Sequence, residues 1–356
     1  MDFTTKLEVL KSFAEEILTE EELAKLFETK TSPVAYDGFE HSGKIHIAQG
    51  LMRANNINKM LKVGCKFKVL VADWHAFTNN KLGGDMEKIH KAGEYMIEVW
   101  RACGLDVDKV EFVWGSDLVS QKEYWEKVLK IGVDSSVKRI VRCAQIMGRQ
   151  ESENLSAGQI FYPCMQAADI FHMGVDIAQL GMDQRKVNML AREVGPKLGF
   201  YKPVAIHHHM LRGLTQINSD KTGIDRSIEL KMSKSIPDSA IFMTDTVEDV
   251  TRKIRGAYCP ERIVEDNPVI EYCKYFIFDK YPSMLIERPQ KFGGNLELFS
   301  YAELEEAFKQ GKLHPLDVKN SLSSYLNKSL EPVRQHFQSG KNQELLKYVN
   351  NRDSRK

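Results

Sequence analysis

Two lysines and two hydroxyl side chains lie close together in residues 231–235, which read KMSKS. Lys231 and Lys234 bracket Ser233, and a polar, loop-like stretch at 216–229 precedes them. Lysines on a mobile segment can bind a polyphosphate whose charge increases in a transition state, and hydroxyl groups add hydrogen bonds. Two lysines at this spacing are more often part of a solvated basic loop. The prediction of a phosphate-binding site therefore needs further evidence from other residues of the sequence.

A second candidate site lies earlier in the chain, where an apolar run at residues 33–36 is followed by a loop of small residues. The loop contains Gly38, Ser42 and Gly43, and apolar residues recur at helical spacing from Ile47 onward. Such a strand, turn and helix N-terminus favour phosphate, because free backbone N–H groups and the helix dipole attract anions and glycine permits close approach. The fingerprints GxGxxG and GxxxxGK followed by Ser or Thr are both absent from the sequence. The pattern therefore predicts a nucleotide site of a different kind.

The elements that would position these residues alternate between strands and helices. The predicted strands are 33–36, 67–73, 110–114, 175–180 and 203–207, and the predicted helices between them are 47–62, 85–102, 120–131, 134–148, 163–172 and 183–197. This alternation predicts an α/β fold with a doubly wound, Rossmann-like parallel sheet, in which ligands bind at the carboxyl ends of the strands. Polar clusters lie at those ends, at residues 36–46, 73–75, 116–117 and 180–184.

The two ends of the chain are predicted to be helical. Residues 1–30 have apolar residues at helical spacing, and Thr19 with Glu22 forms a capping-box pattern. After about residue 246 the strand pattern disappears, and helical spacing is found at 246–258, 267–277, 301–310 and 316–337. We therefore predict an α/β domain at residues 1–244, which includes N-terminal helices at 1–30, and an all-helical domain at residues 245–356.

The composition indicates a globular protein with a core, since 42% of the 356 residues are hydrophobic and 28% are charged. A formal net charge of +1 excludes a global basic field that would attract nucleic acid, although a local patch can still bind it. The six cysteines are scattered without a CxxC pair, which is typical of a reducing compartment. No apolar run reaches the roughly 18–20 residues of a membrane span, and the N-terminus lacks a signal-peptide pattern. We therefore predict a cytoplasmic protein that does not associate with membranes.

Residues 231–235 match in full the second signature of class I aminoacyl-tRNA synthetases. Residues 42–49, SGKIHIAQ, resemble the first signature of that family, the HIGH motif, in its opening residues. Ala48 takes the place of the usual glycine and Gln49 that of the second histidine, which an amide can replace as a hydrogen-bond donor. The two motifs lie in the family's order, with the predicted nucleotide fold between them. The resemblance implies ATP-dependent activation of an amino acid.

Residues 162–169 resemble the YxxxQxxD block of tyrosyl-tRNA synthetases of the archaeal and eukaryotic type. On a helix, Tyr162, Gln166 and Asp169 are spaced i, i+4 and i+7, so one face can meet an ammonium group and a phenol together. Further blocks that resemble the same family are residues 180–186, 291–295 and 313–317. The resemblance spans most of residues 33–337. It implies that L-tyrosine is activated with ATP and then transferred to the 3′ end of tRNA(Tyr).

The resemblance also implies roles for individual residues of the active site. The phenol of tyrosine would be hydrogen-bonded by Tyr36 and Asp169. The ammonium group of tyrosine would be held by Tyr162, Gln166 and Gln184. ATP would be bound by Gly43, His46, Asp183, Lys231, Ser233 and Lys234. The catalytic residues among these would be His46, Lys231 and Lys234, with both lysines on the phosphates.

For tRNA, the resemblance implies an anticodon site in the C-terminal domain and a contact to the acceptor stem. Phe292 and His314 would stack on either side of the first anticodon base, and Asp317 would accept hydrogen bonds from a guanine edge. Arg142, in the basic segment 138–142, would contact the first acceptor-stem pair. The resemblance further implies a homodimer, and Mg²⁺ that accompanies ATP without a dedicated protein site.

Other interpretations stay open at this point. A tryptophanyl-tRNA synthetase has the nearest fold, and segment 237–242 fits either enzyme. A catalytically inactive RNA-binding paralogue would explain the altered HIGH residues, and a nucleotidylyltransferase would share the nucleotide site without needing the helical C-terminal third. The three histidines at 207–209 do not predict a metal site, because consecutive residues at a strand end cannot all converge on one ion. His75 either lines the substrate pocket or packs beside Asp73.

Overall fold

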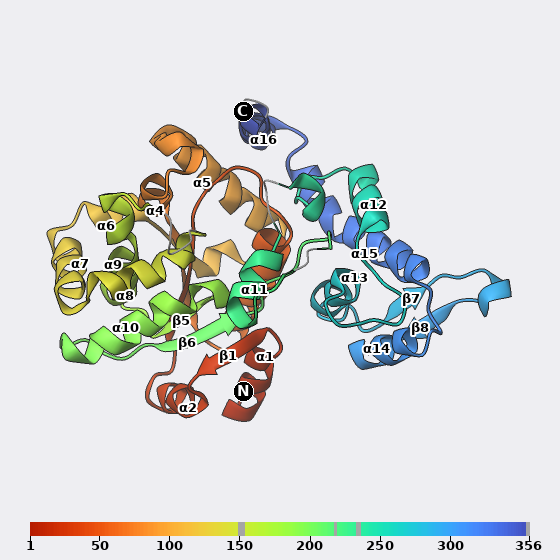
Figure 1. The fold of residues 1–356 in the computed structure, drawn as a ribbon, viewed down its shortest axis with the longest axis horizontal. Helices are drawn as coiled ribbons and strands as arrows, with labels where there is room; N and C mark the ends of the chain where they lie inside the picture. Colours follow the sequence, from red (N-terminus) through yellow and green to blue (C-terminus); the bar gives the residue numbers. More distant parts are fainter. Residues whose placement is uncertain (149–153, 217–218, 233–235, 354–356) are drawn as a thin grey trace.

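A six-stranded sheet forms the centre of the N-terminal part of the molecule (Figure 1). The structure is a computed structural model that describes residues 1–148, 154–216, 219–232 and 236–353. The strands are β1 Ala14–Leu18, β2 Val34–Phe39, β3 Lys66–Val71, β4 Val110–Trp114, β5 Ile177–Gly181 and β6 Val204–His208. They lie in the order β1-β6-β5-β2-β3-β4, and the five strands β2 to β6 run parallel, as predicted.

The chain changes direction across the sheet at β2. From β2 it continues to β3 and β4 on one side, and it later adds β5 and β6 on the other side. β2 pairs with β3 along its full length but with β5 only at Ala35 and Tyr36. The carboxyl ends of β2 and β5 are therefore not joined, and this is the switch point at which open α/β sheets bind ligands.

Helices cover both faces of the sheet, because alternate residues of a strand point to opposite sides. On β2, Ala35 and Tyr36 belong to two different apolar clusters. The first cluster includes residues of α3 (Arg53–Lys62) and α5 (Met86–Ala102). The second includes residues of α7 (Lys122–Asp134), α8 (Val137–Arg142), α9 (Ala157–His172) and α10 (Arg185–Lys197). Short helices α4 (Asp73–Thr78) and α6 (Gly115–Val119) follow β3 and β4 directly. The predicted doubly wound α/β fold is confirmed.

The prediction of helix throughout residues 1–30 was wrong for its middle. Helices α1 (Phe3–Lys11) and α2 (Glu20–Thr29) form, but β1 lies between them and pairs antiparallel with β6. The Thr19 hydroxyl caps α2 as predicted, accepting a 3.2 Å hydrogen bond from Glu22 N. Residues 14–18 continue the helical spacing of apolar residues, but pairing with the free edge of β6 satisfies their backbone groups. Tertiary pairing thus overrides a weak local preference.

The C-terminal part consists mainly of helices, as predicted: α12 Val247–Gly256, α13 Pro268–Tyr272, α14 Tyr301–Lys309, α15 Pro315–His336 and α16 Gly340–Asp353. A two-stranded antiparallel sheet, β7 Met284–Ile286 with β8 Leu296–Leu298, was not predicted. Strands of three residues are too short to show an alternating pattern in the sequence. α15 and α16 both contact α5, so the C-terminal helices pack directly against the α/β part.

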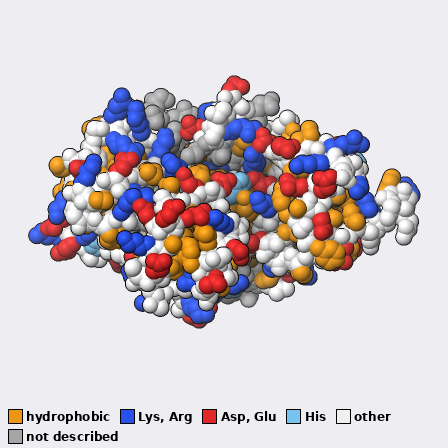
Figure 2. Space-filling model, turned by 90° about the horizontal axis from the view of Figure 1, so that it is seen from below, with side chains coloured by type: hydrophobic (Ala, Val, Ile, Leu, Met, Phe, Trp, Pro, Cys, Tyr) orange, Lys and Arg blue, Asp and Glu red, His pale blue; other side chains and the backbone are white. Residues whose placement is uncertain are grey.

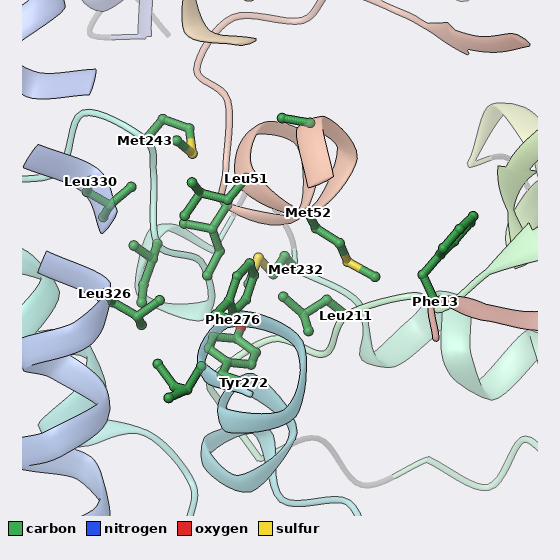
Figure 3. Close-up of a cluster of buried hydrophobic side chains, with 14 of the residues drawn as sticks. Phe13, Leu51, Met52, Leu211, Met232, Met243, Tyr272, Phe276, Leu326 and Leu330 are labelled. Atoms are coloured by element: carbon green, nitrogen blue, oxygen red, sulfur yellow. The ribbon is translucent and has the colours of Figure 1, made fainter. Parts of the chain in front are cut away.

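The junction between the two parts is apolar (Figure 3). Leu51 and Met52 follow the loop after β2, Phe276 follows α13, and Leu326 and Leu330 lie on α15. Figure 3 shows these side chains grouped around the junction, and all five belong to a single buried cluster. The cluster extends from Leu10 at one end of the chain to Val349 at the other.

Charges of both signs are interspersed on the face of the molecule shown in Figure 2, which agrees with the formal net charge of +1. No large area of a single sign stands out on this face. Among the residues that the structure describes, no helix is both long enough and apolar enough to span a membrane.

Candidate active site

A cavity of about 630 Å³ opens at the switch point of the sheet. Residues from the carboxyl ends of β2, β3 and β5, from the loop after β2 and from α9 form its wall. The predicted site residues that line it are Tyr36, His46, Tyr162, Gln166, Asp169, Asp183, Gln184 and Lys231. The structure therefore brings together residues that are separated by up to 195 positions in the sequence.

Two buried polar atoms in the wall of this cavity lack a hydrogen-bond partner among the described residues. Tyr36 Oη and Asp169 Oδ2 make no hydrogen bond to any described residue, although both residues are almost completely buried. The other carboxylate oxygen, Asp169 Oδ1, accepts a 2.9 Å hydrogen bond from Tyr124 Oη. His75 Nε2 lies 3.1 Å from Asp169 Oδ2 but is not aligned for a hydrogen bond. A ligand hydroxyl that accepts from Tyr36 and donates to Asp169 would satisfy both unpaired atoms.

The charges around Tyr36 and Asp169 determine which of the nearby groups carry a proton. Burial, and then the charge of Asp169, raises the pKa of Tyr36 well above the usual value, so its hydroxyl stays protonated. Burial opposes protonation of His75, but the Asp169 carboxylate outweighs it and raises the pKa of His75. The His75 ring also meets the ring of Tyr162 edge-on, with centroids 4.9 Å apart. His75 thus lines the pocket, whereas Asp73 bonds His90 and Ser116 instead.

Helix α9 presents three predicted residues to the cavity on one face. Ser156 and Gln159 form a reciprocal capping box that starts the helix, with Gln159 N donating to Ser156 Oγ at 3.3 Å and Ser156 N donating to Gln159 Oε1 at 3.0 Å. Further along, Gln166 Nε2 donates to Gln184 Oε1 at 3.1 Å. Gln166 Oε1 is buried without a partner among the described residues, so it can accept a hydrogen bond from an ammonium group.

The loop after β2 leads to the other end of the cavity. Gly43 has φ of 102°, a left-handed conformation that favours glycine. Ile47 N donates to Ile241 O at 2.9 Å and Met243 N to Ile45 O at 2.8 Å, so segment 241–243 fixes the backbone on both sides of His46. The next residues, Ala48–Met52, form a π-helical turn before α3 begins. This turn contains the two departures from the HIGH motif, and Gln49 also lines the cavity.

Lys231 reaches the cavity from the opposite side. Its Nζ lies 3.0 Å from Asp183 Oδ2, and both residues line the wall. Burial opposes ionisation of Asp183, but the Lys231 ammonium outweighs it and holds the pKa of Asp183 below the usual value. The pair therefore places one positive and one negative charge beside the loop that carries His46. Ser233 and Lys234 lie outside the described residues.

The comparisons with known proteins agree with this geometry. Residues 28–331 match the family described as tRNA synthetases class I (W and Y). The chain belongs to this family. Among curated relatives of this class I synthetase, tyrosine–tRNA ligase 1, cytoplasmic, of Arabidopsis thaliana is 47% identical, over 97% of this chain and 88% of the relative. The tyrosine–tRNA ligase of Thermococcus gammatolerans is 42% identical, over 95% of this chain and 96% of the relative.

Solved structures of other members resemble this synthetase closely. Tyrosyl-tRNA synthetase of Pyrococcus horikoshii, complexed with L-tyrosine, has a TM-score of 0.92 and 39% identity, over 99% of this chain and all of the other. Tyrosyl-tRNA synthetase of Leishmania major, in complex with tyrosinol, has a TM-score of 0.90 and 42% identity. The match covers all of this chain and 53% of the Leishmania chain.

The residues predicted to contact tRNA lie away from the cavity of the synthetase. Phe292 is 61% exposed, and His314 begins α15, where its Nδ1 accepts a 3.1 Å hydrogen bond from Leu316 N. The Arg288 guanidinium donates to Gly294 O at 2.9 Å and to Lys312 O at 2.7 Å. These bonds hold the loop of Phe292 beside the start of α15, where Asp317 is half-buried in the first turn. Arg142 is exposed at the end of α8.

Sequence reasoning missed a buried cluster beside the Asp183–Lys231 pair. Arg53 Nη1 lies 2.6 Å from Asp37 Oδ2 and 3.1 Å from His208 Nδ1. Gln179 Nε2 lies 2.6 Å from His208 Nδ1. Burial lowers the pKa of His208 well below the usual value, so it is neutral and Nδ1 accepts. Burial raises the pKa of Asp37 to about 6, against the opposing charge of Arg53. The polar positions Asp37 and Gln179, each within an apolar strand, are the sequence signals that could have indicated this cluster.

The three consecutive histidines, residues 207–209, take different partners. His207 bonds Glu16 and Asn188, His208 belongs to the Arg53 cluster, and His209 bonds Glu15 and Glu271. In the part of the chain that the structure describes, no group of three or more His, Cys, Asp or Glu side chains could hold a metal ion.

Proposed function

We propose that the chain is a tyrosine–tRNA ligase, which activates L-tyrosine with ATP to tyrosyl-adenylate and pyrophosphate and then transfers tyrosine to the 3′ end of tRNA(Tyr). The observation that carries this proposal is that Tyr36 Oη and Asp169 Oδ2, two buried atoms of residues that line the cavity, have no hydrogen-bond partner among the described residues. Together they require a ligand group that both accepts and donates, which a phenol does. Leaving either atom unpaired in the complex would cost about 1–3 kcal/mol.

The first step needs positioning and electrostatics rather than a protein nucleophile. The carboxylate of tyrosine attacks the α-phosphorus of ATP, and pyrophosphate leaves with the bonding electron pair. Tyr162, Gln166 and Gln184 hold the ammonium group, so the carboxylate faces the loop after β2. His46, with Gly43, binds the phosphates from that loop, and Lys231 with Lys234 and Ser233 stabilises the charge that develops on the leaving group.

Asp183 has a second use in this proposal. It pairs with Lys231 at 3.0 Å in the ligand-free protein. When ATP binds, its ribose hydroxyls take the hydrogen bonds of Asp183, and Lys231 turns to the phosphates. Mg²⁺ would be carried by the ATP phosphates, because the described residues offer no cluster of ligands for it. Its positive charge would neutralise part of the phosphate charge.

The C-terminal helices supply the tRNA contacts in this proposal. We assign residues 1–244 to the catalytic domain and 245–356 to an anticodon-binding domain, although a shared apolar cluster joins them. The exposed ring of Phe292 and the imidazole of His314 would stack on the first anticodon base, and Asp317 would accept hydrogen bonds from it. Arg142 would contact the acceptor stem. The Arg288 bonds that join the loop of Phe292 to the start of α15 support this assignment.

A homodimer would cover an exposed apolar stripe on α7 and the start of α8. Trp125, Leu129 and Val133 are spaced four residues apart on α7, and Val137 follows; Val133 is 89% exposed. Apolar stripes of this size mark protein interfaces, and a twofold pairing covers the same stripe on both copies. Leu129→Asp should convert dimers to monomers in analytical ultracentrifugation. A wild-type monomer at micromolar concentration would refute the dimer.

We also propose that the protein acts in the cytoplasm. The two Arabidopsis thaliana relatives are both named as cytoplasmic enzymes. The chain spans 43% of the second of them, tyrosine–tRNA ligase 2, so this relative is considerably longer. Fractionation of the native protein tests the compartment directly.

Pyrophosphate exchange across all twenty amino acids tests the function. Tyrosine alone should stimulate exchange, because an indole N–H donates to Asp169 but leaves Tyr36 Oη without an acceptor. Stimulation by tryptophan and not by tyrosine would establish the tryptophanyl alternative. Tight tRNA binding without any exchange would establish an inactive paralogue instead.

A further inference from the structure

The segment after β6 forms the backbone support of Lys231. Residues 211–213 lie antiparallel to residues 230–232, with Gly213 N donating to Leu230 O at 2.8 Å and Met232 N donating to Leu211 O at 3.4 Å. Arg212 and Lys231 are the directly opposed pair. In a pairing of this kind the flanking residues make the hydrogen bonds, so the N–H and C=O of Arg212 point away from Lys231.

Two consecutive residues of α13 bind those outward-pointing groups. Glu271 Oε2 accepts a 3.0 Å hydrogen bond from Arg212 N, and Tyr272 Oη donates to Arg212 O at 2.6 Å. Glu271 is largely buried and Tyr272 is completely buried. The N–H and the C=O of Arg212 are therefore both bound by side chains of α13. The residues on either side of Arg212, Leu211 and Gly213, bind the backbone next to Lys231.

We infer that Glu271 and Tyr272 are positioning residues for the activation step, which fix Lys231 through the backbone of Arg212. The inference rests on the proposed function, because Lys231 matters to activation only if ATP binds beside it. A displacement of about 1 Å at a catalytic group can lower the rate about 100-fold. In the described part of the chain, the backbone on both sides of Lys231 is hydrogen-bonded to Leu211 and Gly213, so the placement of Lys231 depends on residues 211–213.

Apolar packing supports the same arrangement. Met232, the residue after Lys231, is only 5% exposed, although it lies in a polar motif. Figure 3 shows Met232 and Leu211 close to the rings of Tyr272 and Phe276. All four side chains belong to the same buried cluster. The methionine thus anchors the segment at the junction with the C-terminal helices, and Lys231 extends from this anchor toward the cavity.

Glu271 also joins this support to the edge strand of the sheet through His209. The His209 ring lies between Glu15 of β1 and Glu271 of α13, bonding both, and it stacks on Tyr275 with centroids 4.7 Å apart. Burial opposes protonation of His209, but the two carboxylates outweigh it and raise the pKa of His209 to about 9. Other charges that act there are Arg212 and Lys274, which face Glu15, and the adjacent His208, which is neutral.

At neutral pH this site therefore holds an imidazolium ion between two carboxylates. When the pH rises through about 9, His209 loses its proton and the carboxylates of Glu15 and Glu271 repel each other. Glu271, which accepts from Arg212 N, then loses its imidazolium partner and keeps only one charged partner among the described residues, the Arg212 guanidinium, whose Nε lies 3.7 Å from Glu271 Oε1. Activation at saturating tyrosine should decline on the alkaline side with an apparent pKa close to 9.

The test compares Glu271→Ala and Tyr272→Phe with the control Glu248→Ala, which removes an exposed carboxylate from the first turn of α12. In tyrosine-dependent pyrophosphate exchange, Glu271→Ala should lower kcat about 10- to 100-fold, as expected for a displaced catalytic group. The KM for tyrosine should stay within about twofold, because Lys231 acts on phosphate and not on tyrosine. Tyr272→Phe should lower kcat about 3- to 10-fold, for one lost hydrogen bond. The control should leave both constants unchanged.

Glu271→Gln provides a conservative variant, because its amide oxygen still accepts from Arg212 N but carries no charge for His209. It should restore kcat near neutral pH to within about threefold of wild type and move the alkaline limb to lower pH. A purely structural role of Glu271 would not move the pH profile. Unchanged kcat in folded Glu271→Ala, or equal worsening of kcat and tyrosine KM, would overturn the inference. If Glu271→Ala does not fold, unchanged kcat in Tyr272→Phe overturns it equally.

These results are distinct from a failure of the proposed function. If wild-type protein shows no tyrosine-dependent exchange, the function itself is wrong, and this is known before any variant is measured. If wild type exchanges normally and the variants do too, only the positioning role is wrong.

Discussion

Replacing Asp169 with alanine removes a buried carboxylate from the wall of the cavity and should weaken selection of tyrosine over phenylalanine. In the wild-type structure Asp169 Oδ2 is buried and accepts no hydrogen bond from a described residue, although His75 Nε2 lies 3.1 Å away, and Tyr36 Oη is also buried without a hydrogen bond to the described residues. In the proposed complex, tyrosine would supply a hydroxyl to both atoms, whereas phenylalanine would leave both without a hydrogen bond. A site of this kind rejects the analogue without the hydroxyl, a rule for which a tyrosyl enzyme is itself the standard example.

The size of the loss follows from the bonds that disappear. A hydrogen bond to a charged group contributes about 1.5–3 kcal/mol, which corresponds to about a 10- to 150-fold change in kcat/KM. Asp169→Ala should therefore lower kcat/KM for tyrosine by this factor and leave kcat/KM for phenylalanine nearly unchanged. Tyr124→Phe removes only the hydroxyl that donates to Asp169 Oδ1 at 2.9 Å, so it should cost tyrosine less, about 2- to 10-fold.

Pyrophosphate exchange with each amino acid, at saturating ATP, gives both ratios. The KM for ATP should stay unchanged in Asp169→Ala, because in the proposed complex ATP would bind beside His46 and Lys231 rather than beside Asp169. Equal losses for tyrosine and phenylalanine, or equal losses of tyrosine and ATP binding, would mean that Asp169 maintains the fold instead. A thermal melt of each variant separates that outcome from a loss of specificity.

Three further predictions concern other parts of the molecule. Lys231→Ala should lower kcat for exchange about 10²- to 10³-fold, the cost of removing one transition-state donor, while tyrosine affinity measured by equilibrium dialysis stays the same. Asp37 has a pKa raised from 3.8 to about 6 by burial, so its contribution to stability is present below pH 4 and is lost as the pH rises through 6. Asp37→Asn should remove this pH dependence. The free energy of unfolding of the variant minus that of wild type, measured with urea, should therefore increase by about 3 kcal/mol from pH 4 to pH 7. A difference that is the same at both pH values would refute the raised pKa of Asp37. Phe292→Ala should lower kcat/KM for tRNA charging about 5- to 150-fold, which corresponds to the loss of stacking on one base, and should not affect pyrophosphate exchange. An equal effect on exchange would mean that Phe292 only stabilises the fold.

Local sequence patterns predicted the parallel strands, and the common face of three α9 residues that line the cavity, for simple physical reasons. Buried parallel strands are short apolar runs bounded by polar turns, and the helix repeat places Tyr162, Gln166 and Asp169 on one side whatever surrounds them. The roles of these residues came from resemblance to a family, and the structure adds their shared cavity. The unpaired state of Tyr36 Oη and Asp169 Oδ2 is visible only in three dimensions.

Features that depend on distant partners could not be predicted. β1 forms because β6 offers a free edge, and nothing in residues 14–18 indicates that partner. The pairing of Arg53 with Asp37 needs the turn of the chain between β2 and α3, and the bond from Arg212 to Glu271 joins two separate parts of the molecule. Sequence spacing describes one element at a time, whereas these contacts arise from packing between elements.

The apolar junction also determines how the protein unfolds. Since one buried cluster extends from Leu10 to Val349, the α/β part and the C-terminal helices cannot lose structure independently without exposing Leu51, Met243 or Leu330 to water. The whole chain should therefore melt as one cooperative unit, with equal calorimetric and van't Hoff enthalpies. A fragment that ends at residue 244 would carry an uncovered apolar face and should aggregate rather than remain a stable catalytic monomer.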